Sequence, residues 1–205
     1  MSIAKQAKTL RATRSLGAIR QFPPRGTVRC EGPAMFRSQV SRDTACILDV
    51  NPSVTAWRCM SLSIRCGTEG HVPDFHVFNE DGRSMLIDAP DRRLPVSIDN
   101  IAKAASEVGL SYRVLAREEV YDGFRLRNAK DLLRYADCTV TLADRLRLLA
   151  ALDEFGSMPL AECLKAFSET HPVPGISALI LSRYVEIDLD EAPIGPETTV
   201  RRIAR

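Results

Sequence analysis

A hairpin signal near the middle of the chain constrains the fold more than any other feature. Apolar runs at residues 75–77 and 85–87 flank a polar stretch at 79–82 that ends in glycine, which is typical of two antiparallel strands and their turn. If residues 80–82 form a three-residue loop with the glycine in the left-handed conformation, the strand register follows. That register places Asp74 directly opposite Asp88.

Two carboxylates in that position would demand compensation. Facing residues of antiparallel strands have Cβ atoms roughly 4.5–5.5 Å apart. Like charges at this separation need a cation or a raised pKa. Converging carboxylate oxygens are ligands that Mg²⁺ prefers. The alternative is a two-residue turn at Asp81-Gly82, which sets Asp74 opposite Ala89 and sends Asp88 to the other face. The two would then be unrelated surface aspartates.

The elements around the hairpin predict a small mixed α/β domain over residues 34–122. Apolar spacing indicates a helix over about 36–48 and another over about 97–108. Short strand-like runs lie at 54–57, 62–65 and 112–115. The order is helix, three strands, helix, strand.

The pattern changes in the last third of the 205 residues. Residues 123–140 read as a connecting helix. Leucines recur at helical spacing from Leu142 to Leu152, and two further short helices begin near Pro159 and Pro174. An extended run at 185–189 follows. We therefore predict an all-α, winged-helix-like domain over residues 141–205. Arg183 is the only cation of its third helix and the following strand is acidic, which favours a protein partner over DNA phosphates. The alternative is a module that only completes the core.

The charge distribution indicates a basic N-terminal arm over residues 1–33. The first 29 residues have a net charge of +7, against +2 for the whole chain, which leaves −5 for the remainder. A basic segment on an acidic body suggests attraction to nucleic acid. Prolines and glycines near its end favour an extended conformation, and a merely solubilising tail is the alternative. The candidate DNA-binding residues are Lys5, Lys8, Arg11, Arg14, Arg20, Arg25 and Arg29.

Composition and targeting signals predict a soluble cytoplasmic protein without a membrane partner. No window approaches the roughly 18 uncharged apolar residues of a membrane span, and the N-terminus lacks a secretory apolar region. The six cysteines include no C-x-x-C pair, so a zinc site is not expected and the thiols read as core residues.

Several motifs resemble the TnsA-type transposon endonucleases, a family of the PD-(D/E)xK nuclease superfamily. The opening helix at 36–54 resembles the start of that family's nuclease domain. Val72-Pro73-Asp74-Phe75 and Leu86-Ile87-Asp88-Ala89-Pro90 resemble its central motif. The similarity continues through 109–115, 127–129 and the helical C-terminal part, so that it covers about residues 30–195.

The resemblance implies a restriction-endonuclease-like mixed sheet with flanking helices and a metal-dependent cut at the 5′ ends of a mobile element. In that scheme a helix glutamate, the aspartate after proline and a third strand residue hold Mg²⁺. A lysine two positions further supports the attacking water, whose pKa the metal lowers. It also implies a separate DDE transposase and an AAA+ ATPase as partners.

Residue by residue, the family's site is incomplete in this chain. Asp74 matches the aspartate, and Asp88 fits the acidic strand position. The helix glutamate falls at Ser41, a poor Mg²⁺ ligand, and the lysine falls at Pro90, which has no charge. Arg92 or Arg93 is close enough in sequence to reach in, but arginine stays protonated and cannot act as a base.

These observations lead to one hypothesis and two alternatives. We expect a TnsA-like DNA-binding protein of a transposition system whose nuclease site is weakened or lost. The first alternative is an active Mg²⁺-dependent DNA endonuclease that uses Asp74 and Asp88. The second is a non-catalytic scaffold between transposase and ATPase. His76 shares the predicted face of Asp74 by strand periodicity and is either a proton shuttle, a metal ligand or, as we expect, an ordinary strand histidine.

Overall fold

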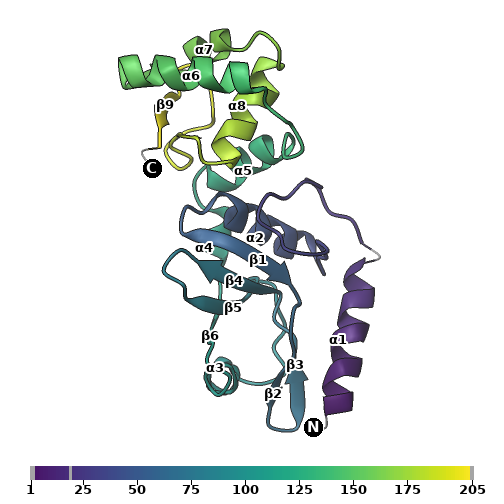
Figure 1. Ribbon diagram of the computed structural model, residues 1–205. Helices are drawn as coiled ribbons and strands as arrows, with labels where there is room; N and C mark the ends of the chain where they lie inside the picture. The colour runs from purple at the N-terminus through teal and green to yellow at the C-terminus, as the bar shows by residue number, and fades with distance from the viewer. Residues whose placement is uncertain (1–2, 19, 204–205) are drawn as a thin grey trace. The chain divides into compact units, whose positions relative to one another are not determined.

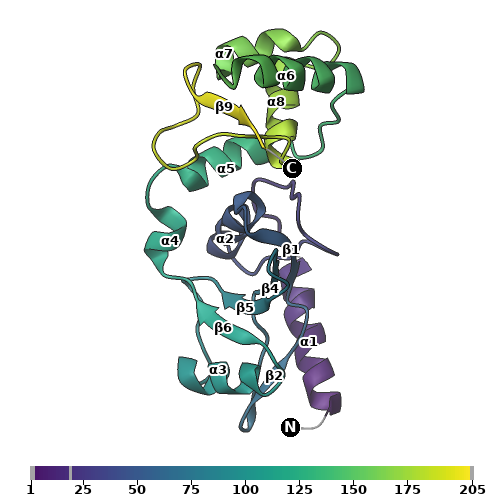
Figure 2. The same cartoon turned by 60° about the vertical axis from the view of Figure 1, so that its left-hand side comes forward.

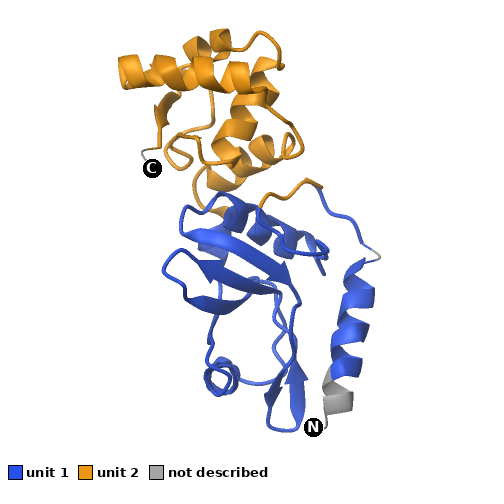
Figure 3. Cartoon of the chain, in the orientation of Figure 1, with its two compact units in different colours: residues 1–23, 29–120 blue, residues 24–28, 121–205 orange. Residues whose placement is uncertain are grey.

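A computed structural model of the chain describes residues 3–18 and 20–203. It divides into two compact units, drawn in different colours in Figure 3. Unit 1 comprises residues 1–23 and 29–120, and unit 2 comprises residues 24–28 and 121–205. A four-stranded mixed sheet together with several helices confirms the α/β class predicted from the sequence.

The sheet of unit 1 consists of β1 (Val54–Cys59), β4 (Phe75–Asn79), β5 (Ser84–Asp88) and β6 (Ser111–Val114), in that spatial order (Figure 1). The first three strands pair antiparallel, and β6 pairs parallel with β5. The parallel pairing requires a crossover, which α3 (Ile98–Ser106) provides. A small hairpin of β2 (Ile64–Cys66) and β3 (Glu69–His71) precedes β4.

Each face of this sheet has its own core. On one face Trp57 and Phe75 pack edge to face, with ring centroids 5.7 Å apart, and Phe36 lies against both. Phe36 precedes α2 (Gln39–Val50), which begins at the N-cap Ser38. On the other face Leu86 packs with residues of β2 and α3, among them Ile64 and Ile101.

The hairpin has the predicted three-residue loop. Gly82 adopts a positive φ of 76°, and the N–H of Asn79 donates to the carbonyl oxygen of Arg83 at 2.9 Å. Phe75 pairs with Ile87 in the same register. This register continues to Asp74 and Asp88, so the two aspartates meet at the open end of the hairpin and the two-residue turn is excluded.

The N-terminal segment is not the extended arm that its composition predicts. Residues Ile3–Ala18 form helix α1. Arg14 fixes this helix to the loop after β1, because its Nε donates to the carbonyl oxygen of Met60 at 3.0 Å and its Nη2 to that of Ser61 at 3.4 Å. The prolines and glycines that suggested an extended chain all lie beyond α1.

A short segment before α2 lines the free edge of β1. Cys30 forms a parallel bridge with Trp57. The N–H of Trp57 donates to the carbonyl oxygen of Arg29 at 2.9 Å, and the N–H of Glu31 donates to that of Trp57 at 2.8 Å. Both outward main-chain groups of Trp57, on the edge strand of the sheet, are therefore hydrogen-bonded to this segment.

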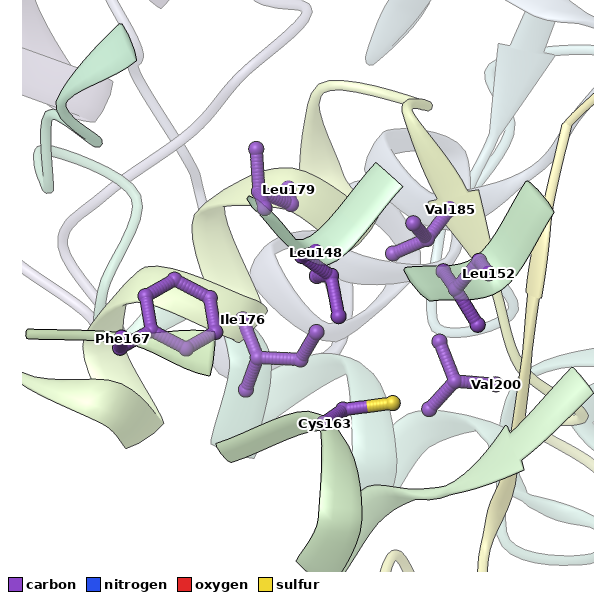
Figure 4. Packing of buried hydrophobic residues seen from close by; sticks show 8 residues of the cluster. All are labelled: Leu148, Leu152, Cys163, Phe167, Ile176, Leu179, Val185 and Val200. Atoms are coloured by element: carbon purple, nitrogen blue, oxygen red, sulfur yellow. The ribbon is translucent and has the colours of Figure 1, made fainter. Parts of the chain in front are cut away.

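Unit 2 is built from short helices around one apolar core. Figure 2 shows the ribbon of the chain turned by 60° from the view of Figure 1. After α4 (Arg117–Tyr121) at the boundary of the units, its elements are α5 (Arg125–Leu133), α6 (Leu142–Phe155), β7 (Ser157–Pro159), α7 (Leu160–Cys163), the 3-10 turn η1 (Leu164–Ala166), α8 (Pro172–Leu181), β8 (Val185–Glu186) and β9 (Thr199–Arg202). Leu148, Leu152, Ile176 and Leu179 form the centre of the core, which Figure 4 shows.

Two features of unit 2 differ from the sequence prediction. The unit is not all-α, because β7, β9 and β8 form a small antiparallel sheet. The extended run expected at 185–189 shortens to a two-residue strand, β8. The sequence pattern did not predict the longer partner strand, β9. Its residues Thr199–Arg202 are mostly polar or charged, and only Val200 lies in the core. Within residues 3–18 and 20–203, no helix combines the length and apolar character that crossing a bilayer requires.

Candidate acidic site

Asp74 and Asp88 form a reciprocal pair at the open end of the β4–β5 hairpin. The main-chain N–H of Asp74 donates to Oδ1 of Asp88 at 2.9 Å. The main-chain N–H of Ala89 donates to Oδ2 of Asp74 at 3.0 Å. Both aspartates are buried, with exposed fractions of 2% and 0%. Each side chain therefore satisfies the backbone of the opposite strand, beyond the last paired residues of the ladder.

Two further donors surround Asp88. His71, at the end of β3, places Nε2 2.6 Å from Oδ2, and the hydroxyl of Tyr112 on β6 donates to the same oxygen at 2.7 Å. Burial opposes ionisation of Asp88, but these hydrogen bonds and the charge of Arg92 outweigh it and hold its pKa below the ordinary carboxyl value. In turn, burial and the Asp88 hydrogen bond raise the pKa of Tyr112, so its hydroxyl stays a donor.

Arg37 forms a bidentate ion pair with Asp74. Its Nε and Nη2 lie 2.8 and 2.9 Å from the two carboxylate oxygens, and the same Nη2 lies 2.6 Å from Oδ1 of Asp91. The arginine stands immediately before Ser38, so the start of α2 sets its position. Burial, followed by the charge of Asp88, raises the pKa of Asp74, and Arg37 limits that rise. Hydrogen bonds from Arg37 and Ser38 lower the pKa of Asp91 despite its partial burial.

Arg92 is the second cation beside the pair. Its Nη2 donates to the carbonyl oxygen of Val72 at 2.8 Å, which positions the guanidinium. Its Nη1 then lies 3.5 Å from Asp74, and its Nε lies 3.7 Å from Asp88. Of the two arginines that the sequence offered, the structure brings in Arg92, whereas Arg93 is exposed.

The two positions that depart from the family pattern contribute no ligand to this cluster. Ser41 is buried in the first turn of α2, where its N–H donates to the Oγ of Ser38 at 3.1 Å. Pro90 follows Ala89 and offers neither a charge nor an N–H. The uncharged Ser41 and Pro90 thus leave the acidic pair without the glutamate and lysine that the family resemblance implies.

The donor set at this site does not fit Mg²⁺. Every carboxylate oxygen of Asp74 and Asp88 accepts an N–H or faces a His71 nitrogen or the Tyr112 hydroxyl. A hard divalent cation in a near-octahedral arrangement would have to displace these donors, above all the bidentate guanidinium of Arg37. In the part of the chain that the structure describes, no three His, Cys, Asp or Glu side chains are grouped so as to hold a metal ion.

His76 lies on β4 but does not join this cluster. Its ring packs against Phe78, with centroids 4.3 Å apart. Burial, with a smaller contribution from the Arg58 charge, lowers the pKa of His76, so its ring is neutral at pH 7. The ring contact with Phe78 is compatible with the ordinary strand histidine that the sequence analysis expects.

The candidate DNA-binding cations separate into two groups. Lys8, Arg11, Arg20 and Arg25 are exposed. Arg14 holds the Met60–Ser61 loop and so has a structural role, whereas Arg29 is half-buried and its main chain lines β1. The side chain of Lys5 lies outside the described residues.

Unit 2 contains an acidic cavity, in contrast to the cations of the N-terminal segment. A cavity of about 570 Å³ lies over the small sheet and is lined by Glu186, Asp188, Glu191 and Glu197, with Arg201 as its cation. Helix α8, the third of the predicted winged-helix module, is largely buried. This charge repels phosphates.

Sequence reasoning found the two aspartates but missed most of their partners. Arg37 lies 37 residues before Asp74, and Tyr112 lies 24 residues after Asp88. The local pattern contains no signal for either contact. His71 and Arg92 were the partners with a usable signal, since His71 lies in the segment that leads into Pro73-Asp74 and Arg92 lies four residues after Asp88. No protein-family model matches this chain, and a search of curated proteins finds no match either.

Proposed function

We propose that this chain is a TnsA-like DNA-binding protein of a transposition system, in which the acidic pair of a PD-(D/E)xK-type domain no longer cuts DNA. The resemblance implies a restriction-endonuclease-like sheet with flanking helices, and the four-stranded mixed sheet of unit 1 is compatible with it. The observation that carries the proposal is the bidentate contact of Arg37 with Asp74. It engages the acidic pair with a fixed protein cation.

Charge also argues against phosphate at the acidic pair. Three carboxylates, those of Asp74, Asp88 and Asp91, face two guanidinium groups, those of Arg37 and Arg92. A cluster with this balance does not attract a phosphodiester. The exposed cations Lys8 and Arg11, on α1, do. Binding and the former site of cutting are thus assigned to different surfaces.

Unit 2, as a winged-helix-like module, is assigned to protein partners. The acidic cavity beside β8 and β9 suits a basic surface rather than DNA. By resemblance the partners are the transposase and the AAA+ ATPase, and the compartment is the cytoplasm. Mg²⁺ belongs only to the alternative in which the chain is an active endonuclease.

The test measures DNA binding and DNA cutting separately on the full chain. Fluorescence anisotropy of a labelled duplex over a salt series gives the affinity and its salt slope. We expect the double variant Lys8→Gln/Arg11→Gln to weaken binding and to reduce the slope by up to about 2, since each phosphate contact contributes about 0.9. Lys103→Gln, which removes an exposed cation from α3 of the same unit, is the matched control.

Supercoiled plasmid with Mg²⁺ or Mn²⁺ provides the cutting assay. We expect no nicking by the wild type or by Asp74→Ala. Nicking that disappears in Asp74→Ala would establish the endonuclease alternative. An absence of salt-dependent DNA binding in both the wild type and the Lys8/Arg11 variant would favour the alternative of a non-catalytic scaffold between transposase and ATPase.

A further inference from the structure

We infer that the guanidinium of Arg37 is the resident counter-ion of the acidic cluster, and that its removal turns Asp74 and Asp91 into a divalent-cation site. The inference deepens the proposed function, and it rests on that proposal for the loss of cutting activity. Its geometry, however, concerns the protein alone.

The position of Nη2 of Arg37 carries the first step. This one nitrogen lies 2.9 Å from Oδ2 of Asp74 and 2.6 Å from Oδ1 of Asp91. It therefore occupies the point between two carboxylate oxygens that belong to different segments of the chain. A cation at that point is what two converging carboxylates require, and the fork of an arginine supplies it with fixed geometry.

Access to this point comes from the solvent side. The side chains of Arg37 and Asp91 are 21% and 33% exposed, whereas that of Asp74 is 1% exposed. An ion that replaced the guanidinium would meet one buried carboxylate and one accessible carboxylate, with water completing its shell. Asp88 would stay outside this shell, because Asp74, His71 and Tyr112 already occupy its oxygens.

The energetic argument points the same way. Removing one partner of a buried ion pair is strongly destabilising, because the remaining charge loses its compensation. A variant that lacks Arg37 keeps Arg92, whose Nη1 lies 3.5 Å from Asp74, but the vacated point between Asp74 and Asp91 then favours protonation of Asp74 or the binding of another cation. A divalent ion carries more positive charge than the arginine does. Carboxylate oxygens are also the ligands that such an ion prefers.

The test uses the full chain, Mn²⁺ alone and no DNA. Bound Mn²⁺ is measured by the loss of the free-ion electron paramagnetic resonance signal, and thermal unfolding is followed with and without Mn²⁺. We expect Arg37→Gln to bind one Mn²⁺ ion about tenfold or more tightly than the wild type does. Its unfolding temperature should fall without Mn²⁺ and recover with it. Arg37→Gln/Asp74→Asn should lose that gain.

The controls separate a local effect from a general loss of positive charge. Arg83→Gln removes a highly exposed arginine of the hairpin loop that pairs with Asp81 at 3.5 Å, and it should behave like the wild type. Arg37→Lys keeps a charge without the bidentate fork, so Mn²⁺ should displace it at a lower concentration than it displaces arginine. Equal Mn²⁺ affinity of Arg37→Lys and the wild type would overturn the inference, even if Arg37→Gln does not fold.

Two outcomes of the main experiment also decide the question. Folded Arg37→Gln without any gain in Mn²⁺ affinity would refute the counter-ion role. Tight Mn²⁺ binding by the wild type would do the same. Neither result depends on DNA binding, so failure of this inference is distinct from failure of the proposed function.

Discussion

The indole N–H of Trp57 donates to the buried carboxylate of Asp49 at 2.9 Å, and the main-chain N–H of Arg29 donates to the same oxygen at 3.0 Å. Asp49 belongs to the last turn of α2, Trp57 to β1, and Arg29 to the segment that lines the edge of β1. One carboxylate oxygen thus joins a helix, a strand and an edge segment in the core of unit 1.

This arrangement predicts different results for two substitutions of Asp49. Asp49→Asn keeps an acceptor oxygen at the same place, whereas Asp49→Leu leaves two N–H donors without one. We expect the leucine variant to have a free energy of unfolding about 2 kcal/mol lower than that of the asparagine variant. Urea unfolding followed by the fluorescence of Trp57, the single tryptophan, measures the difference. Equal stabilities would show that burial, and not the shared oxygen, sets the role of Asp49.

Gly82 is the residue on which the hairpin register depends. Its φ of 76° lies in the left-handed region, and no atom within 4 Å opposes a side chain there. Backbone conformation alone should therefore decide the effect of substitution. We expect Gly82→Val to lower the free energy of unfolding by about 1–2 kcal/mol and Gly82→Asn to lower it by less, since asparagine tolerates this region. Urea unfolding of unit 1 provides the measurement, and the valine variant matching the asparagine variant would contradict it.

Asp144 predicts a pH dependence for unit 2. Its fully buried carboxylate accepts the main-chain N–H groups of Ser168, Glu169 and Thr170, at 3.0, 3.2 and 2.6 Å. Burial opposes ionisation, but these donors hold the pKa of Asp144 well below the ordinary carboxyl value. A depressed folded-state pKa stabilises the fold above the unfolded pKa of about 3.9, and the contribution is lost as the pH falls below it.

The measurement for Asp144 compares the wild type with Asp144→Asn. The asparagine variant should be less stable at pH 7, and the difference should narrow as the pH falls from about 5 to 3. Urea unfolding followed by far-ultraviolet circular dichroism at each pH gives this difference. A difference that stays constant over the range would show that the charge of Asp144 is not what its three N–H donors recognise.

Two glycines of unit 2 offer a matched pair for core packing. A Cβ at Gly175 in α8 would lie 2.5 Å from a ring carbon of the buried Phe167, whereas a Cβ at Gly195 would meet its nearest atom at 3.9 Å. We expect Gly175→Ala to destabilise the unit by about 1–3 kcal/mol through overpacking. Gly195→Ala should have little effect. Hydrogen exchange of the peptides that contain Phe167 tests this locally, and unchanged protection in Gly175→Ala would contradict the prediction.

The features that depend on interactions between residues close in sequence could be predicted from local sequence patterns. The turn at 80–82 set the register of β4 and β5, so the meeting of Asp74 and Asp88 could be derived from the sequence. Amphipathic spacing likewise predicted α2, α3 and α6 to within a few residues. In each case the deciding interactions lie within about ten residues of one another.

Contacts between segments that are distant in sequence could not be predicted from local patterns. Arg37 pairs with Asp74 because the start of α2 lies beside the open end of the hairpin, which is a property of the tertiary structure. Helix α1 was misassigned because the prolines and glycines beyond it dominated the local composition. Its Arg14 anchor to the carbonyl groups of Met60 and Ser61 involves backbone atoms, which leave no mark in the sequence of that loop.

The strip of chain around Cys30 has a consequence for self-association. The exposed edge of a sheet can pair with a strand of another chain, and many proteins prevent this by covering or bending the edge strand. Because residues 29–31 already use the outward hydrogen-bonding groups of Trp57, an incoming peptide cannot extend the ladder there without first displacing them. Polymerisation of this molecule by strand addition is therefore blocked at that border of the sheet.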